Sequence, residues 1–361
     1  MDIFQHRNPL WRTRQALQKG SLTLGFMGGS ISDSRAGWNW PEPVIRWFKA
    51  TYPYVRLRVE NGAIGATGSD LAVFRAEETL LHPDCDLVFV EYAVNDGSLP
   101  PELRSRTQEG LIRKLLQDPG RDVLLTYTYA QDFYSDMLGD RQPPTIAGLE
   151  RLGEHYGLGS VWMSLFALRE VMSGLMRWEE WLPDGLHPQA YGSLSYGRSV
   201  IAFMQQELAA DTAIATTRPE LPKPLNPRHW GNATLLPLEQ VQTHGPWTLR
   251  RWYGCPFMRE VWDTAAVGAS MEFDFIGRGL VLGFDFGNQS AELAYRLDDG
   301  AWQQTQRERF DWAGLTGWFR VEHIADDLAD GPHHFEMRVV HGNRPECKGT
   351  DMRLALIGIV R

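Results

Sequence analysis

The sequence predicts two domains of different classes: a doubly wound α/β domain built on a parallel sheet, followed by an all-β sandwich. Three observations predict this arrangement. Apolar strand segments alternate with helical patterns as far as residue 208. A proline-rich stretch then interrupts the chain, and the strand segments beyond it follow one another without long helices between them. The length of 361 residues also fits two domains of ordinary size.

Five short segments indicate the strands of the first domain: four are apolar runs, and Val55–Val59 alternates apolar and polar residues. Continuous apolar runs are typical of strands that are buried on both faces of a sheet. Strands that alternate with helices predict right-handed crossovers and a parallel sheet covered by helices. The predicted strands are Leu22–Phe26, Val55–Val59, Leu87–Val90, Val123–Tyr127 and Val161–Leu165, and the predicted helices are Pro43–Ala50, Ser69–Leu81, Leu103–Leu116, Ile146–Tyr156 and Tyr191–Leu208.

A linker is predicted at residues 216–228, because four prolines in this stretch cannot continue a helix. It separates a first domain at residues 1–215 from a second at 229–361, where strand segments and the turn signal Asp298-Asp299-Gly300 predict a jelly-roll-like β-sandwich. The predicted strands are Ser270–Ile276, Gly279–Phe286, Ala291–Leu297, Trp318–His323, His333–Val340 and Arg353–Val360.

Composition excludes several classes of function. With 36 Lys and Arg against 45 Asp and Glu, the net charge of −9 gives no electrostatic footprint for nucleic acid or an anionic membrane. The apolar runs are too short to span a bilayer, and the start of the chain lacks a secretory pattern. Cys85, Cys255 and Cys347 are widely spaced, and the adjacent His333 and His334 would point to opposite faces of a strand. We therefore expect a cytoplasmic protein with reduced thiols and without cofactor or metal.

Three short motifs follow predicted strands, at the edge where doubly wound sheets bind their ligands. In Gly28-Gly29-Ser30-Ile31-Ser32, small neighbours expose the Ser30 hydroxyl as a nucleophile. Asn95 can donate its amide to a developing oxyanion. Asp184 lies three residues before His187, so the carboxylate can orient the imidazole that takes a proton from a nucleophile. Each motif alone also fits an ordinary turn, but together they predict a Ser-His-Asp site.

The order and spacing of these motifs resemble those of the SGNH, or GDSL-type, hydrolases, roughly over residues 20–208. The family's Gly-Asp-Ser block appears as Gly28-Gly29-Ser30, its Gly-x-Asn-Asp block as Ala93-Val94-Asn95-Asp96, and its Asp-x-x-His block as Asp184-Gly185-Leu186-His187. The block that supplies an oxyanion N–H corresponds to Asn61–Thr67. The resemblance implies a flavodoxin-like three-layer fold and a carboxylic ester hydrolase.

The resemblance also implies a role for each residue. Ser30 is the nucleophile, His187 the base and Asp184 its orienting partner. The oxyanion is held by the backbone N–H of Ser30, the Asn95 amide and a third N–H from Gly65 or Ala66. Counting from Asn61 without a gap places Ala66 at the position of the family's oxyanion glycine, and its N–H can serve if its φ is negative. Between the two candidate donors, Gly65, directly before Ala66, is slightly preferred. Gly29 and Ala93 depart from the family pattern of Asp and Gly.

The substrate implied by the resemblance is an acetylated mono- or oligosaccharide. Family members that deacetylate plant polysaccharides combine this domain with a sandwich, and Trp302, Trp312 and Trp318 are candidate sugar-stacking residues there. The expected activity is that of an acetyl esterase, similar to an acetylxylan esterase. A sugar O-acyltransferase with the same triad, a lipase- or thioesterase-type hydrolase and a non-catalytic carbohydrate-binding protein stay open. So does a purely structural sandwich that covers the first domain or forms a homo-oligomer interface.

Overall fold

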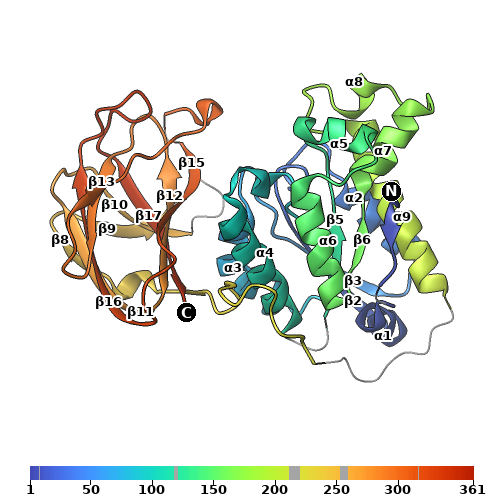
Figure 1. The fold of residues 1–361 in the computed structure, drawn as a ribbon, viewed down its shortest axis with the longest axis horizontal. Coiled ribbons are helices and arrows are strands. Elements are labelled where there is room, and N and C mark those ends of the chain that lie inside the picture. Colours follow the sequence, from blue (N-terminus) through green and yellow to red (C-terminus); the bar gives the residue numbers. More distant parts are fainter. Residues whose placement is uncertain (8, 118–120, 211–219, 253–258, 316) are drawn as a thin grey trace. The chain divides into compact units, whose positions relative to one another are not determined.

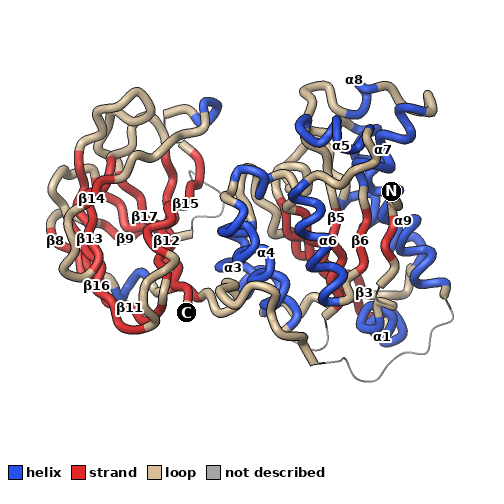
Figure 2. Tube along the Cα trace, viewed as in Figure 1, coloured by secondary structure: helices blue, strands red, loops and turns tan. Residues whose placement is uncertain are grey.

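The computed structural model describes residues 1–361 apart from 8, 118–120, 211–219, 253–258 and 316. The chain divides into two compact units, Met1–Gly231 and Asn232–Arg361 (Figure 1). The first unit mixes helices and strands, and in the second, strands predominate (Figure 2). Both predicted fold classes are therefore confirmed.

The sheet of the first unit has the strand order β1-β6-β5-β4-β2-β3. All strands except β1 are parallel, and β1 pairs antiparallel with β6 at one edge. Without β1, the remaining order is the flavodoxin-like 2-1-3-4-5, whose switch point lies beside β2. The bounds are β1 Phe4–Gln5, β2 Ser21–Gly28, β3 Arg56–Asn61, β4 Leu87–Glu91, β5 Asp122–Thr126 and β6 Gly159–Val161.

Two helical layers accompany this sheet (Figure 1). In one, α4 packs against α3 and α6; in the other, α9 packs against α2, α7 and α8. The bounds are α1 Trp11–Lys19, α2 Pro41–Thr51, α3 Ser69–Ala76, continued by the π-helical turn η1 Glu77–Leu81, α4 Pro101–Leu116, α5 Tyr134–Leu138, α6 Pro144–Tyr156, α7 Met163–Met172, α8 Trp178–Trp181 and α9 Ala190–Ala209.

One predicted strand of this unit, Val161–Leu165, is wrong beyond its first residue. The strand β6 ends at Val161, and the helix α7 begins at Met163. The apolar residues Met163, Leu165 and Leu168 are buried on α7. A short apolar run fits a buried helix as well as a buried strand, and only the fold distinguishes the two.

Residues 220–231 belong to the first unit and contact its helices α3 and α4. The Glu109 carboxylate on α4 accepts the backbone N–H groups of Leu225 and Asn226, each at 2.6 Å. Trp230 is fully buried, with its ring centroid 5.7 Å from that of Phe74. The boundary between the two units therefore falls after Gly231, whereas the sequence placed the linker at 216–228. Residues 216–219 of that linker lie outside the described residues.

The second unit is a sandwich of two antiparallel sheets. One has the order β15-β12-β17-β10-β9 with β7 beside β17, and the other has the order β14-β13-β16-β11-β8. Apolar side chains from both sheets form one core. The bounds are β7 Thr234–Leu235, β8 Gln242–His244, β9 Thr248–Arg251, β10 Glu260–Thr264, β11 Ser270–Gly277, β12 Gly279–Phe286, β13 Glu292–Leu297, β14 Gln303–Gln304, β15 Trp318–Ala325, β16 Gly331–Val340 and β17 Met352–Val360. The six predicted strands correspond to β11, β12, β13, β15, β16 and β17.

The tryptophans that the sequence singled out on the sandwich differ in exposure. Trp312 is 61% exposed and Trp302 is 40% exposed, whereas Trp318 is half-buried. Cys85 and Cys347 are buried free thiols, and Cys255 lies outside the described residues. Among the helices that the structure describes, none has the length and apolar character needed to cross a membrane.

Candidate active site

The strand β2 brings Ser30 to the carboxyl edge of the sheet, two residues beyond its end at Gly28. The loop after β3 runs alongside, because the Gly62 N–H donates to the Phe26 carbonyl and the Ile64 N–H to the Gly28 carbonyl, both at 2.9 Å. The Ser32 N–H closes a turn onto the Gly29 carbonyl at 3.2 Å. Ser30 therefore lies on a tight turn at the switch point, where sheets of this order bind ligands.

The three residues predicted as a triad form one chain of hydrogen bonds. Ser30 Oγ lies 2.9 Å from His187 Nε2, and His187 Nδ1 lies 2.8 Å from Asp184 Oδ2. An ionised Asp184 can only accept, so it fixes the ring proton on Nδ1 and leaves Nε2 free to accept the serine proton. Such a chain can activate a hydroxyl for attack on a carbonyl carbon.

Backbone N–H groups of the loop that carries Asp184 and His187 donate hydrogen bonds to the Asp184 carboxylate. Asp184 Oδ1 accepts the backbone N–H of Leu186 at 2.9 Å and that of His187 at 2.7 Å. The turn needs glycine at Gly185, whose φ is 79°. Burial raises the pKa of Asp184, but the hydrogen bonds from His187 and Leu186 outweigh it and leave that pKa below its usual value. Asp184 therefore stays ionised beside the imidazole.

The two candidates for the third oxyanion N–H differ in backbone conformation. A β-carbon built on Gly65 would lie 3.5 Å from Ser30 Cβ, so Gly65 lies directly against the candidate nucleophile. Ala66 has a φ of 57°, in the left-handed region that alanine rarely adopts. The negative φ that the sequence argument required of Ala66 is therefore absent.

The side chain of Asn95 lies over the backbone of Gly29. A β-carbon built on Gly29 would lie only 1.9 Å from Asn95 Oδ1 and 2.7 Å from Asn95 Cγ. Asn95 opens the 3₁₀ turn η2, Asn95–Ser98, which follows β4. Glycine at position 29 therefore makes room for the Asn95 side chain beside Ser30.

Two buried carboxyl groups near this edge had no role in the sequence analysis. Asp96 accepts the Ser69 N–H at the start of α3 and the Gln108 side-chain amide, both at 2.8 Å, and burial raises its pKa to about 7. Glu91 closes the otherwise apolar strand β4 and is also fully buried. The signal that could have found Glu91 is a charged residue at the end of a continuous apolar run.

An open pocket of about 550 Å³ adjoins the Asp184–His187 loop at Gly185. It lies between the segment after β5 and the short helix α8. Its lining combines aromatic rings with short polar side chains: Tyr129, Tyr134 and Trp178 with Gln131, Asp132 and Ser135. This mixture is typical of a site for a small ligand that has both apolar faces and hydroxyl groups.

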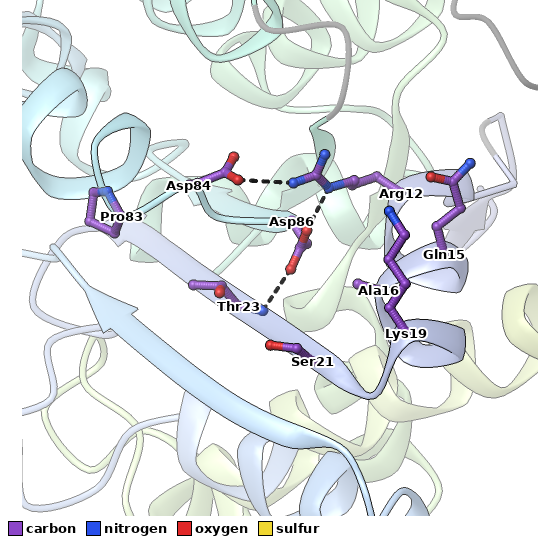
Figure 3. A pocket seen from close by; sticks show the side chains of 9 residues that line it. All are labelled: Arg12, Gln15, Ala16, Lys19, Ser21, Thr23, Pro83, Asp84 and Asp86. Atoms are coloured by element: carbon purple, nitrogen blue, oxygen red, sulfur yellow. Dashed lines mark hydrogen bonds and ion pairs between the residues drawn. The ribbon is translucent and has the colours of Figure 1, made fainter.

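A second pocket, of about 250 Å³, lies at the opposite edge of the sheet (Figure 3). Ser21 and Thr23 at the start of β2 line it, together with Asp86, which accepts the Thr23 N–H at 2.8 Å. Arg12 from α1 bonds both Asp84 and Asp86 across this pocket (Figure 3). Because ligands of such sheets bind at the carboxyl ends of the strands, this pocket is no part of the candidate site.

One group of potential metal ligands lies on the sandwich. Ligand atoms of Glu272, His334 and Glu336 lie within 4.8 Å of one another on β11 and β16. Arg296 donates to Glu336 at 2.6 Å, and His334 Nδ1 lies 2.7 Å from Asp274 Oδ1. Cross-strand ion pairs account for these contacts, so we assign no metal to the group.

The sequence comparisons give no family: no protein-family model matches the chain, and no curated protein matches it. The solved structures that resemble it include a two-domain esterase (CEX) active on acetylated mannans, co-crystallised with mannopentaose. That structure is 23% identical, with a TM-score of 0.81 over 98% of this chain and 96% of the other. A second structure of a two-domain esterase (CEX) active on acetylated mannans is 23% identical, with a TM-score of 0.82 over 97% of this chain and 95% of the other. The chain therefore has the two-domain fold of these proteins, an α/β unit followed by a β-sandwich.

Proposed function

We propose that this protein is a serine esterase that removes acetyl groups from saccharides. The observation that carries the proposal is the chain of hydrogen bonds from Ser30 through His187 to Asp184. Such a chain at the switch point of a doubly wound sheet fits acyl transfer to a serine.

In the proposed mechanism, Ser30 Oγ attacks the ester carbonyl carbon while His187 Nε2 takes its proton. The N–H groups of Ser30 and Gly65 and the Asn95 amide stabilise the oxyanion, and each such donor contributes about 2.7–4 kcal/mol in the transition state. When the tetrahedral intermediate collapses, His187 returns the proton to the leaving sugar oxygen. A water molecule, deprotonated by His187, then attacks the acyl-enzyme and releases acetate and free Ser30. Asp184 keeps its charge throughout and stabilises the imidazolium.

The pocket at Gly185 supports a saccharide as the alcohol part of the ester. The rings of Tyr134 and Trp178 offer apolar surface to the C–H groups of a pyranose, and the polar lining offers partners to its hydroxyl groups. The activity of the structural neighbour on acetylated mannans, and its bound mannopentaose, support the same class of substrate.

The test measures acetate release from four esters: p-nitrophenyl acetate, p-nitrophenyl octanoate, an acetylated xylo-oligosaccharide and an acetylated manno-oligosaccharide. The wild type is compared with Ser30→Ala and with Ser173→Ala, a control at the exposed end of α7. We expect release from the acetylated saccharides, a loss of at least about 10³-fold in Ser30→Ala and none in Ser173→Ala.

Each other outcome has a distinct meaning. Preference for the octanoate would favour a lipase-type enzyme over a saccharide deacetylase. Transfer of acetate to an added sugar acceptor would make the protein an acyltransferase. A wild type that is inert on all four esters, or a Ser30→Ala variant that keeps full activity, would refute the esterase.

A further inference from the structure

The buried carboxyl group of Glu91 lies directly beneath the turn that carries Ser30. In the register of β2 and β4, Glu91 pairs with Gly28, the last residue before that turn. A β-carbon built on Gly28 would lie 3.0 Å from Glu91 Oε2, so backbone and carboxyl group are in close contact. Glu91 is 1% exposed, and none of the proposed chemical steps uses it.

Three donors from two neighbouring segments converge on this carboxyl group. Glu91 Oε2 accepts the Gly29 N–H at 3.3 Å and the Ser32 hydroxyl at 3.0 Å. Glu91 Oε1 accepts the Thr128 hydroxyl, just beyond β5, at 2.8 Å. Ser32 Oγ in turn accepts the indole N–H of Trp40 at 2.8 Å. The residues on either side of Ser30 are thus tied to one buried group.

We propose that Glu91 is a positioning residue, which holds the Ser30 turn in its reactive geometry and does so only as a carboxylate. The inference rests on the proposed function, because it concerns the same nucleophile. An ionised carboxyl group can accept from all three donors at once. A neutral one must itself donate a proton, whereas the Gly29 N–H can only donate. Protonation on Oε2 therefore weakens the contact to Gly29, because a hydroxyl oxygen is a poorer acceptor, and protonation on Oε1 leaves Oε2 a weaker acceptor than in the carboxylate.

Glu91 changes charge in the range where a histidine-dependent esterase works. Burial raises its pKa to about 7, although the hydrogen bonds from Thr128, Ser32 and Gly29 lower it. Asp33, on the Ser30 turn, is already paired with Arg35. Asp96, on η2, also raises the pKa of Glu91, and burial and the charge of Glu91 raise the pKa of Tyr92, after β4, and of Tyr196, on α9.

This arrangement adds a second ionisable group whose protonation lowers kcat as the pH falls. His187 must be neutral to act as the base, and Glu91 must be charged to hold the turn. We expect the acid limb of the kcat profile of the wild type to fall with the slope of two protons. In Glu91→Gln, which resembles the neutral acid at every pH, the limb falls with the slope of one. The plateau kcat drops about ten- to hundredfold, the loss that a small misplacement of a reacting group causes, while KM changes little.

The assay uses p-nitrophenyl acetate and the full-length chain, with rates divided by the concentration of active serine titrated with a fluorophosphonate. This correction removes any loss of folded protein, so a merely structural role leaves the corrected kcat and the slope unchanged. Asp122→Asn is the matched control, because Asp122 is a buried carboxylate at the amino end of β5 that accepts from Thr13. It is expected to alter stability and to leave the two-proton slope in place.

Thr128→Val is a second, milder test. It removes the donor to Oε1 without changing the size of the side chain. The lost hydrogen bond raises the pKa of Glu91, so the acid limb shifts upward by about one pH unit. Suppose that the wild type is active, that Glu91→Gln keeps both its kcat and its two-proton slope, and that the acid limb of Thr128→Val does not shift. These results would overturn this inference and leave the esterase proposal in place. A wild type inert on every ester would refute the esterase itself, and the positioning role with it.

Discussion

Replacing Gly29 by alanine should disable the site without unfolding the protein. The new β-carbon would lie 1.9 Å from Asn95 Oδ1 and 2.7 Å from Asn95 Cγ, distances that no side chain tolerates. Asn95 follows β4 on a short, partly exposed turn, so its side chain can swing away at small cost to the fold. The displacement removes the Asn95 amide from the proposed oxyanion site.

The expected loss follows from the value of one oxyanion donor. Removal of such a donor costs about 2.7–4 kcal/mol in the transition state, which corresponds to a fall in kcat of about 10²–10³-fold. KM should change little, because the interaction is made mainly in the transition state. The midpoint of urea unfolding should stay close to that of the wild type.

A double-mutant cycle tests this cause directly, with kcat on p-nitrophenyl acetate measured for Gly29→Ala, Asn95→Ala and the double variant. If displacement of Asn95 is the cause, Gly29→Ala costs almost nothing further once Asn95 is alanine. Gly97→Ala is the matched control, since a β-carbon there meets nothing within 4 Å. The reasoning would be refuted if Gly29→Ala kept the kcat of the wild type, or if the double variant lost the sum of the two single losses in activation free energy.

Three further predictions concern stability, each measured by urea unfolding. Gly110→Ala places a β-carbon 2.7–2.8 Å from the backbone of Trp230 and should destabilise the first unit by about 1–3 kcal/mol; an unchanged midpoint would contradict the tight packing. Ala66→Gly relieves a φ of 57° and should stabilise by about 0.5–1 kcal/mol, and a loss would show that the strain is absent. Burial raises the pKa of Asp96 to about 7, so the folded state binds more protons between about pH 4 and 7 and loses stability as the pH rises through that window. Asp96→Asn should reduce that loss between pH 5 and 7.5 by about 2–3 kcal/mol, and an equal loss in both proteins would exclude the shift.

The parts of the fold that the sequence predicted are those where burial fixes the residue pattern. The strand β4 has both faces covered, so Leu87–Val90 is continuously apolar and could be recognised directly. The short strands β7, β8, β9 and β14 have two to four residues, too few for a period to appear. Val161–Leu165 was misread because its apolar residues divide between a strand and a buried helix.

The candidate site was predictable to the extent that it consists of strand ends. In a parallel sheet the carboxyl ends meet at one edge, so Ser30 after β2 and Asn95 after β4 could be expected to approach. The Asp184–His187 pair lies between the helices α8 and α9, so its approach to Ser30 rested on the order of the motifs. Their hydrogen-bonding distances needed the structure, and so did the left-handed φ of Ala66, because neither follows from residue order. For Glu91 the sequence offered one signal, a charge at the end of a continuous apolar run, but its partners could not be predicted because they come from the segments after β2 and β5.

The position of residues 220–231 defines what a transferable hydrolase module would contain. A gene fusion or a natural recombination that cut the chain near residue 215 would remove Trp230 from its place against Phe74. It would also leave the Glu109 carboxylate without its two backbone donors. An exchange after Gly231 would carry these contacts along. Residues 220–231 are therefore part of the α/β unit, and a recombined α/β unit would have to include them to keep these contacts.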